Sequence, residues 1–431
     1  MVYSNQFAII IILLGGYMFL PEKTAIDLPM LPPFNKESAS ILAILIGCSF
    51  VAKHKITLLG KGKVKWLILI YLMSPFLTAM NNGEVIVIHG TVLPAMNYYD
   101  ALTELIGHTI TLVPFIIGRQ FFKKTESQLL FFKVMAVGGL LYSLLVLIEI
   151  RMSPQLHTWV YGFFPHQFIQ MKRMGGWRPV VFMSHGLTLA IFMAAAFVSS
   201  YVFVQKKKRI AGFLALHVAC YLFVILILCK SYAPLFYVLM ILLVLKLCSI
   251  KMQFKFAKIV AIFVLLYPLL SILDWFPHKS MVNLAEEISL ERAQSLEYRF
   301  TNEYILLNHA KQKVFFGWGT WSRNRVFSKE TGEDLSTTDG DWIITLGTYG
   351  IIGFAAKFLL FIYPVFRAVS VYRFVQTKEE KNLLAIHSLL ISFILLDQIP
   401  NSSLSIWVWL FAGILLGRTE TISREVSLMR R

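Results

Sequence analysis

Two carboxylates stand where a polar stretch of the chain meets an apolar one, in the order Asp339-Gly340-Asp341-Trp342. A carboxylate at a membrane–water boundary can act as the general base that takes a proton from an attacking hydroxyl. The structural alternative is a helix cap, with Asp339 at the N-cap and Asp341 in the first turn, because negative charge is favourable there. We interpret Asp339 and Asp341 as the candidate catalytic residues.

Four positively charged residues are candidates for binding an anion. Arg173 and Arg178 lie in the cluster QMKRMGGWRP, Lys230 lies in a very short turn between apolar segments, and Arg299 lies in the polar stretch. Arginine presents a planar fork of donors that stays charged, which suits the oxygens of a phosphate. The alternatives are cations that snorkel to the interface or contact lipid headgroups, and for Arg299 a solvated helix face.

Further ionisable residues are predicted to support this site. Arg292 lies seven residues before Arg299 and shares its helix face, and Glu303 lies four residues after Arg299, so that the two can pair. Ionisable residues inside a membrane protein are functional candidates by default. Four more lie near the outer ends of apolar segments and are candidates to line the same cavity: Glu104, His108, His185 and Asp397.

Membrane helices must position these residues. The chain has 431 residues, of which 57% are hydrophobic and only 15% are charged, whereas soluble domains carry about 25% charged residues. Apolar runs long enough to cross a bilayer recur from end to end. We predict an all-α polytopic membrane protein of about twelve transmembrane helices, near residues 6–20, 38–52, 66–80, 101–118, 129–150, 179–204, 210–228, 234–250, 259–273, 341–365, 383–398 and 406–417.

The first apolar run is expected to be a retained span, because no small-residue cleavage site follows it. The four cysteines fall in or beside apolar segments without metal-ligand spacing. We interpret them as small apolar packing residues.

Membrane topology explains the net charge of +17. If the N-terminus is cytoplasmic, the inner loops and tail hold 23 of the 41 Lys and Arg residues but only five acids, a difference of +18. Cytoplasmic loops are enriched in Lys and Arg, so no nucleic-acid partner is needed. Only the outer loops 151–178 and 274–340 break this trend. Long loops escape the rule, but loop 151–178 is shorter, which makes a functional role a candidate reason.

The polar stretch 274–340 divides the chain into three parts. Residues Asn283–Lys313 carry apolar side chains at helical spacing without Pro or Gly, which predicts a helix lying on the outer membrane face. Gly317 and Gly319 then break this helix. The predicted parts are residues 1–273 with nine spans, residues 274–340 as a large outer loop, and residues 341–431 with three spans and a cytoplasmic tail.

At four places the chain resembles the O-antigen ligase and polysaccharide polymerase (Wzy-type) family of bacterial inner-membrane proteins. KRMGGWRPVVFMSHG resembles the family's Arg-x-x-Gly segment, and CKSYAPLFYVL resembles its Ser-Arg turn, with Lys230 near the arginine position. YRFTNEYILLNHAKQKVFFGWGTW resembles its Arg, aromatic and Gly-x-Gly pattern. DGDWIITLGTYGIIG resembles a His-amide, nine residues, Gly-x-x-Gly motif, with Gly350 and Gly353 as the glycines and Asp339 in place of the histidine.

The resemblance implies a membrane glycosyltransferase C-like fold in the bacterial inner membrane, with loop 274–340 and the active site on the periplasmic face. It implies transfer of a glycan from undecaprenyl diphosphate to an acceptor hydroxyl, without a metal or other cofactor. The four cations would then bind the diphosphate. The implied partners are the lipid-linked glycan, an acceptor glycan or lipid A core, membrane lipids and other polysaccharide assembly proteins.

Several functions stay open at this stage. Polymerisation of O-antigen or exopolysaccharide repeat units is preferred, and ligation of the glycan to lipid A core is the alternative within the same chemistry. A transporter or flippase of lipid-linked oligosaccharide is the alternative of another class, although such proteins place charges at the bilayer midplane. A purely structural scaffold would leave the arginines of loop 151–178 unexplained. The Asp-x-Asp pair also resembles a metal site of nucleotide-sugar glycosyltransferases, but no nucleotide fold surrounds it, so no metal is expected.

Overall fold

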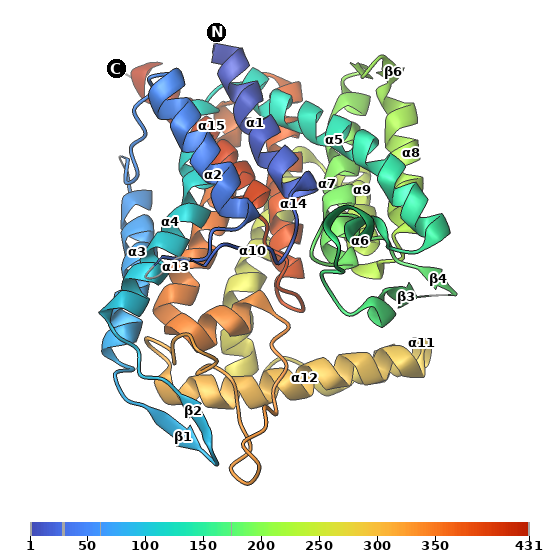
Figure 1. Cartoon of the computed structure of the whole chain (residues 1–431). Coiled ribbons are helices and arrows are strands. Elements are labelled where there is room, and N and C mark those ends of the chain that lie inside the picture. The colour runs from blue at the N-terminus through green and yellow to red at the C-terminus, as the bar shows by residue number, and fades with distance from the viewer. Residues whose placement is uncertain (1, 28–30, 61, 174, 430–431) are drawn as a thin grey trace.

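The protein is mainly helical. A computed structural model describes residues 2–27, 31–60, 62–173 and 175–429, apart from the side chains of residues 2–4, 288 and 292 (Figure 1). About 70% of the residues are helical. Five helices of the described chain are long and apolar enough to cross a membrane. They are α4 (Tyr98–Phe121), α5 (Thr125–Met152), α7 (Gly186–Gln205), α10 (Ile250–Ile272) and the helix that starts with α13 (Asp341–Val371).

Each of the twelve predicted spans overlaps a helix. The other seven predicted spans coincide with helices that are shorter or less apolar than these five. In four of them the apolar helical segment is only 14–17 residues long. The remaining helices in this set are α1 (Val2–Phe19), α2 (Lys36–Ile46), α3 (Val64–Met80), α8 (Ala215–Leu228), α9 (Tyr232–Leu247), α14 (Lys378–Asp397) and α15 (Ile406–Met429).

The surface of the helical bundle is apolar. Large side chains remain exposed along its helices, including Leu141 on α5, Leu243 on α9 and Phe7 on α1, with 61%, 50% and 49% of their surface accessible. An exposed apolar belt of this kind suits a bilayer as the surrounding solvent. Cys48 and Cys229 are buried, as packing residues should be, but Cys220 is exposed on α8, so its predicted packing role is wrong.

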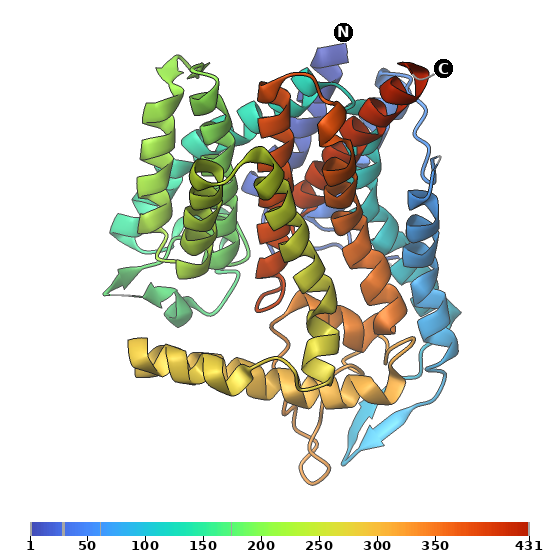
Figure 2. The ribbon, with the colours of Figure 1, turned by 180° about the vertical axis from the view of Figure 1, so that it is seen from behind.

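The loops that were predicted to share a side lie at the same end of the bundle. Both chain ends and the hairpin β5–β6 (Arg209–Ile210, Phe213–Leu214) lie at the upper end in Figure 1. The long loop and the hairpin β1–β2 (Ile86–Ile88, Thr91–Leu93) lie at the lower end, and Figure 2 shows the same arrangement from behind. The chain ends and the hairpin β5–β6 thus lie at the end of the bundle opposite the long loop.

The sixth predicted span begins later than its apolar sequence suggests. Residues 179–185 form a turn, and α7 starts at Gly186. The buried Glu149 carboxylate on α5 explains this, because its Oε2 accepts the backbone N–H groups of Val180 and Val181, both at 2.7 Å. A backbone held by a side chain in this way is not available to a helix. Helix α7 therefore begins at Gly186, eight residues after Arg178.

The long loop contains the predicted surface helix in two pieces. Helix α11 (His278–Ile288) and helix α12 (Leu290–Ala310) are separated at Ser289, whose φ of −169° is extended. In Figures 1 and 2, α12 runs across the lower end of the bundle, roughly perpendicular to the other helices. The buried Arg323 joins this loop to the loop after α3, because it donates to the carbonyl oxygens of Glu84 at 2.8 Å and Pro94 at 2.9 Å.

Glycines join the long loop to α13. Gly317 and Gly319 both have positive φ angles, and the backbone N–H of Gly319 donates to the carbonyl of Thr348 at 2.9 Å. Gly350 interrupts α13 with φ 66° and ψ −171°, and a Cβ there would lie 2.2 Å from the Phe315 carbonyl oxygen. Only glycine adopts this backbone conformation readily. The loop around Gly317 and Gly319 therefore packs directly on the backbone of α13 near Gly350.

Candidate functional site

Arg178 is the most buried of the four predicted anion-binding cations. It lies just before the turn that leads into α7, and only 8% of its surface is exposed. Its Nε and Nη2 both donate to the Ser231 hydroxyl at the start of α9, at 3.0 and 2.6 Å. No described carboxylate pairs with it. Burial lowers the pKa of Arg178 to about 10, so the guanidinium remains charged at neutral pH without a paired anion.

Arg173 and Lys230 lie beside Arg178. Arg173 is exposed in the hairpin β3–β4 (Lys172–Arg173, Gly176–Trp177), and its positive charge is the second cause that lowers the pKa of Arg178. Lys230 Nζ donates to the Arg173 carbonyl at 3.3 Å. A Cβ on Gly176 would lie 2.1 Å from the same Nζ, so the glycine leaves room for the lysine. The two segments with predicted cations therefore meet.

Arg299 reaches the same region from α12. Its Nη1 donates to the Pro400 carbonyl at 2.5 Å and lies 3.2 Å from the Asn401 side-chain oxygen. Its charge also lowers the pKa of Arg178. Three arginines from loop 151–178 and from α12 thus converge at the lower end of the bundle. We call Arg173, Arg178 and Arg299 the arginine cluster.

Two histidines line the cluster. His185 caps α7, and its Nδ1 accepts the Leu187 N–H at 3.1 Å, so this imidazole is neutral and carries its proton on Nε2. Its ring lies edge-on to that of His166, with centroids 4.8 Å apart. In this state the free Nε2–H of His185 is a hydrogen-bond donor.

Asp397 supports the loop that receives Arg299. It is fully buried at the end of α14, and it accepts from the Asn401 amide at 3.1 Å and from the Ser403 hydroxyl at 3.0 Å. The same Asn401 faces Arg299. Asp397 is therefore a positioning residue that fixes the loop between α14 and α15.

Asp341 is engaged in an ion pair and is 5% exposed. Lys357, in the half of α13 beyond the break at Gly350, places its Nζ 2.8 Å from the Asp341 carboxylate. The backbone N–H of Asp341 is also occupied, because it donates to the carbonyls of Gln398 and Asn401. Asp341 therefore holds α13 together across the kink, and this partner makes it a weak candidate for the base.

Asp339 differs from Asp341. It precedes α13 in an irregular segment, is partly exposed, and its carboxylate has no hydrogen bond or ion pair with any described residue. Its neighbours tie it to the cluster, because Thr337 N–H donates to Asn302 on α12 at 2.8 Å and Gly340 packs on the Ile399 carbonyl. Gly340, not Asp339, is the N-cap of α13, so the alternative interpretation of Asp339 as a helix cap is wrong, while Asp341 does lie in the first turn. Asp339 is the free carboxylate next to the loop that Arg299 contacts.

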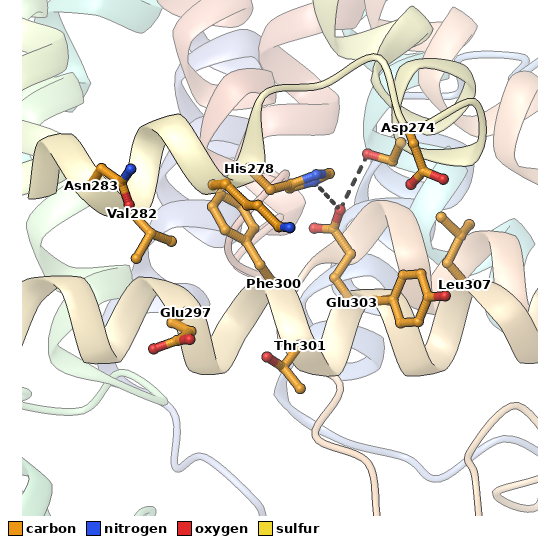
Figure 3. Close-up of a pocket in the computed structure, with 12 residues that line it drawn as sticks. Asp274, His278, Val282, Asn283, Glu297, Phe300, Thr301, Glu303 and Leu307 are labelled. Atoms are coloured by element: carbon orange, nitrogen blue, oxygen red, sulfur yellow. Dashed lines mark hydrogen bonds and ion pairs between the residues drawn. The ribbon is translucent and has the colours of Figure 1, made fainter.

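Glu303 does not pair with Arg299, contrary to the prediction. It accepts from the Tyr267 hydroxyl at 2.9 Å and from Ser271 at 3.3 Å. His278 lies 3.6 Å from the Glu303 carboxylate (Figure 3). These donors come from the end of α10 and the start of α11, which place the carboxylate in a pocket of about 520 Å³ between α11 and α12. Arg299 instead turns to the loop after α14, which lies nearer to its position on α12.

Two other candidate residues, Glu104 and His108, lie away from the arginine cluster, and the side chain of a third, Arg292, is not among the described residues. Glu104 accepts from the Tyr349 hydroxyl, and His108 stacks on Tyr71 with ring centroids 4.2 Å apart, so both belong to the packing around α4. The side chain of Arg292 lies outside the described residues. Lys357 was not singled out in the sequence, although a lysine inside an apolar segment is a signal of a functional or paired residue.

The arginine cluster forms no ion pair with a described carboxylate, the charge of Asp397 acts on it, and Asp339 lies next to the loop that Arg299 contacts. Within the described residues, no group of three His, Cys, Asp or Glu side chains is placed to hold a metal ion. Comparison with models of known protein families gave no match, and no curated protein is significantly similar to the chain. We therefore infer the function from the chemistry of the site.

Proposed function

We propose that the protein transfers a glycan from an undecaprenyl diphosphate-linked donor to a sugar hydroxyl and so polymerises repeat units of O-antigen or exopolysaccharide. The observation that carries this proposal is Arg178, a buried guanidinium that forms no hydrogen bond or ion pair with a described carboxylate, although the charge of Asp397 acts on it. Burying an unpaired charge is costly. An anionic ligand would offset this cost, and a diphosphate at the membrane surface supplies two negative groups for the arginine cluster.

The proposed reaction needs positive charge on one side of the sugar and a base on the other. The acceptor oxygen attacks the anomeric carbon of the donor, and the bond from that carbon to the phosphate oxygen breaks. Its electron pair leaves with undecaprenyl diphosphate, where the arginine cluster stabilises the growing negative charge. Asp339 takes the proton of the attacking hydroxyl, as a general base. Asp341 is the second choice for this role.

The proposal includes a finer architecture. We propose that twelve helices span the bacterial inner membrane in a glycosyltransferase C-like arrangement, with the shorter ones crossing where the bilayer is locally thinned. Loop 274–340 then faces the periplasm, and α12 lies at the membrane surface with Arg299 toward the bundle. This placement supports access for a water-soluble acceptor on one side and a lipid-borne donor on the other.

A transporter of lipid-linked oligosaccharide is the second candidate. The break in α13 at Gly350 favours it, because transporters often hold their substrates at discontinuous helices. The position of the arginine cluster at one end of the bundle favours the enzyme instead. Ligation to lipid A core differs from polymerisation only in the acceptor, which this site does not distinguish.

The test is a transfer reaction with purified protein in lipid nanodiscs. The substrate is the lipid-linked repeat unit extracted from a strain that lacks this protein. Under the proposal, lipid-linked products of two and more repeat units form together with free undecaprenyl diphosphate. Transport alone would move the lipid across a vesicle membrane without changing its length. Unchanged repeat units in the nanodisc reaction, with fully folded protein, would refute the transferase.

A further inference from the structure

A polar cavity of about 230 Å³ lies inside the bundle, next to the arginine cluster. Its wall combines the carboxylates of Glu37 and Asp341, the ammonium of Lys357, and the rings of Tyr71 and Trp409. Hydroxyl groups from α4, α7 and the loop between α14 and α15 complete the lining. In a protein whose helices are mostly apolar, a cavity with this chemistry calls for a polar occupant.

Three of the four charged residues that line the cavity are already paired. Asp341 pairs with Lys357, and Glu22 pairs with the buried Lys36, which also lies over the Tyr17 ring. Glu37 is different. It is partly buried at the start of α2, and its carboxylate has no hydrogen bond or ion pair with any described residue, although the charge of Lys36 acts on it. A carboxylate in such a place needs donors, and none of the described side chains provides them.

The cavity and the arginine cluster share two segments of the chain. Ser402 lines the cavity, and Asn401 just before it faces Arg299. Ser184 lines the cavity, and Gly186 two residues later packs against the Arg178 side chain, because a Cβ there would lie 2.7 Å from it. A ligand that spans this boundary can therefore have its phosphates at the arginines and its next group in the cavity.

We infer that this cavity is a saccharide subsite in which Glu37 accepts hydroxyl groups of one sugar ring, an inference that rests on the proposed function. Sugar hydroxyls are neutral donors, and they satisfy a carboxylate without adding charge. Tyr71 and Trp409 add apolar wall to the cavity, while one face of the Tyr71 ring is covered by His108. A volume of 230 Å³ equals that of about eight liquid waters, which fits one ring rather than a chain.

Two sources can supply this ring, and they share the same chemistry. One is the sugar attached to the diphosphate of the donor, and the other is the terminal sugar of the acceptor. A repeat-unit oligosaccharide released from its lipid by mild acid distinguishes them, because it can accept but, without a diphosphate, cannot donate. Titrating the lipid-linked donor and this soluble acceptor separately gives a KM for each.

The test compares Glu37→Gln with the wild type in nanodiscs. The control is Glu330→Gln, which makes the same change at an exposed site of the long loop. Because Glu37 has no described partner, the variant is expected to fold, and a thermal melt checks this. We expect the KM for one substrate to rise about tenfold or more, since a hydrogen bond to a charged group is worth about 1.5–3 kcal/mol. Ser402→Ala, a second lining change, should raise the same KM by a smaller factor.

The outcomes separate the two proposals. A higher KM for the donor alone assigns the ring to the donor, and a higher KM for the soluble acceptor alone assigns it to the acceptor. Values of both KM within threefold of the wild type would overturn the saccharide subsite, even if transfer itself proceeds. A loss of kcat with both KM unchanged would also overturn it. No transfer by the wild type would instead refute the proposed function.

Discussion

Replacing Arg178 by alanine separates a functional from a structural role of this residue. The guanidinium has five N–H donors, of which the Nε–H and one Nη2–H donate to Ser231. The three remaining donors are available to a diphosphate. Loss of one such stabilising residue costs catalysis about 10²–10³-fold, or about 2.7–4 kcal/mol of transition-state stabilisation. We expect Arg178→Ala to lower the transfer rate by this factor.

The stability of the same variant should change little. Ser231 keeps its hydrogen bond to the Cys229 carbonyl at 3.2 Å, so the change leaves no stranded polar group. It also removes a buried charge that has no described carboxylate partner, and such a charge destabilises the folded state. A purely structural arginine would behave in the opposite way, with a lower melting temperature and a near-normal rate per folded molecule.

The assay measures initial rates of lipid-linked product formation together with the melting temperature of each variant. Arg178→Lys keeps the charge but loses the planar fork, so its rate should lie between those of alanine and the wild type. Arg325→Ala is the matched control, because Arg325 pairs with Asp334 on the exposed part of the long loop. Exposed ion pairs contribute about 0–1 kcal/mol. A rate for Arg178→Ala within threefold of that of Arg325→Ala would refute the diphosphate role.

Three further predictions follow from the same structure. Asp339→Asn should lower the transfer rate about 10²–10⁴-fold without loss of stability. Asp341→Asn should cost about 3–5 kcal/mol of stability, because it leaves Lys357 buried without its partner. Normal transfer by Asp339→Asn would show that another residue is the base. Gly350→Ala should prevent accumulation of folded protein, while Gly15→Ala, where a Cβ meets nothing within 4 Å, should not; equal expression of both would contradict the kink. A cysteine at position 330 in a Cys-free background should react with an impermeant thiol reagent from the periplasm, and labelling only after permeabilisation would reverse the topology.

The helices were predictable because their cause is local. Each apolar run produced a helix, since a backbone in an apolar solvent must satisfy its own hydrogen bonds. The predicted start of the sixth span was wrong, because a side chain distant in the sequence binds the backbone there. Glu149 holds residues 179–185 as a turn, and nothing in the sequence around Arg178 reveals that a carboxylate on α5 reaches them.

The candidate site was predictable as a set of residues but not as a set of contacts. Arg173, Arg178, Lys230 and Arg299 were found from their residue types and positions, and the fold brings their segments together. The pairing of Arg299 with Glu303 failed, although the spacing allows it. Helical spacing gives the neighbours along α12, but the loop after α14 and the end of α10 decide which side chains each residue meets.

The two acids beside Gly340 show the same limit. In the sequence Asp339 and Asp341 are nearly equivalent, and a base or a helix cap suits either. The break at Gly350 folds α13 so that Lys357 returns to Asp341, a contact sixteen residues away that no helical periodicity predicts. Glu37 was overlooked for a similar reason, because its cavity is assembled from seven separated segments.

The most direct test of the central claim is equilibrium binding of undecaprenyl diphosphate, without any glycan, to the protein in nanodiscs. The arginine cluster predicts that the lipid diphosphate binds and that Arg178→Ala and Arg299→Ala each weaken binding by about tenfold or more, since each removes charged hydrogen bonds worth about 1.5–3 kcal/mol. Undecaprenyl monophosphate should bind more weakly than the diphosphate. Equal affinities of the wild type and both variants for the diphosphate would contradict the account.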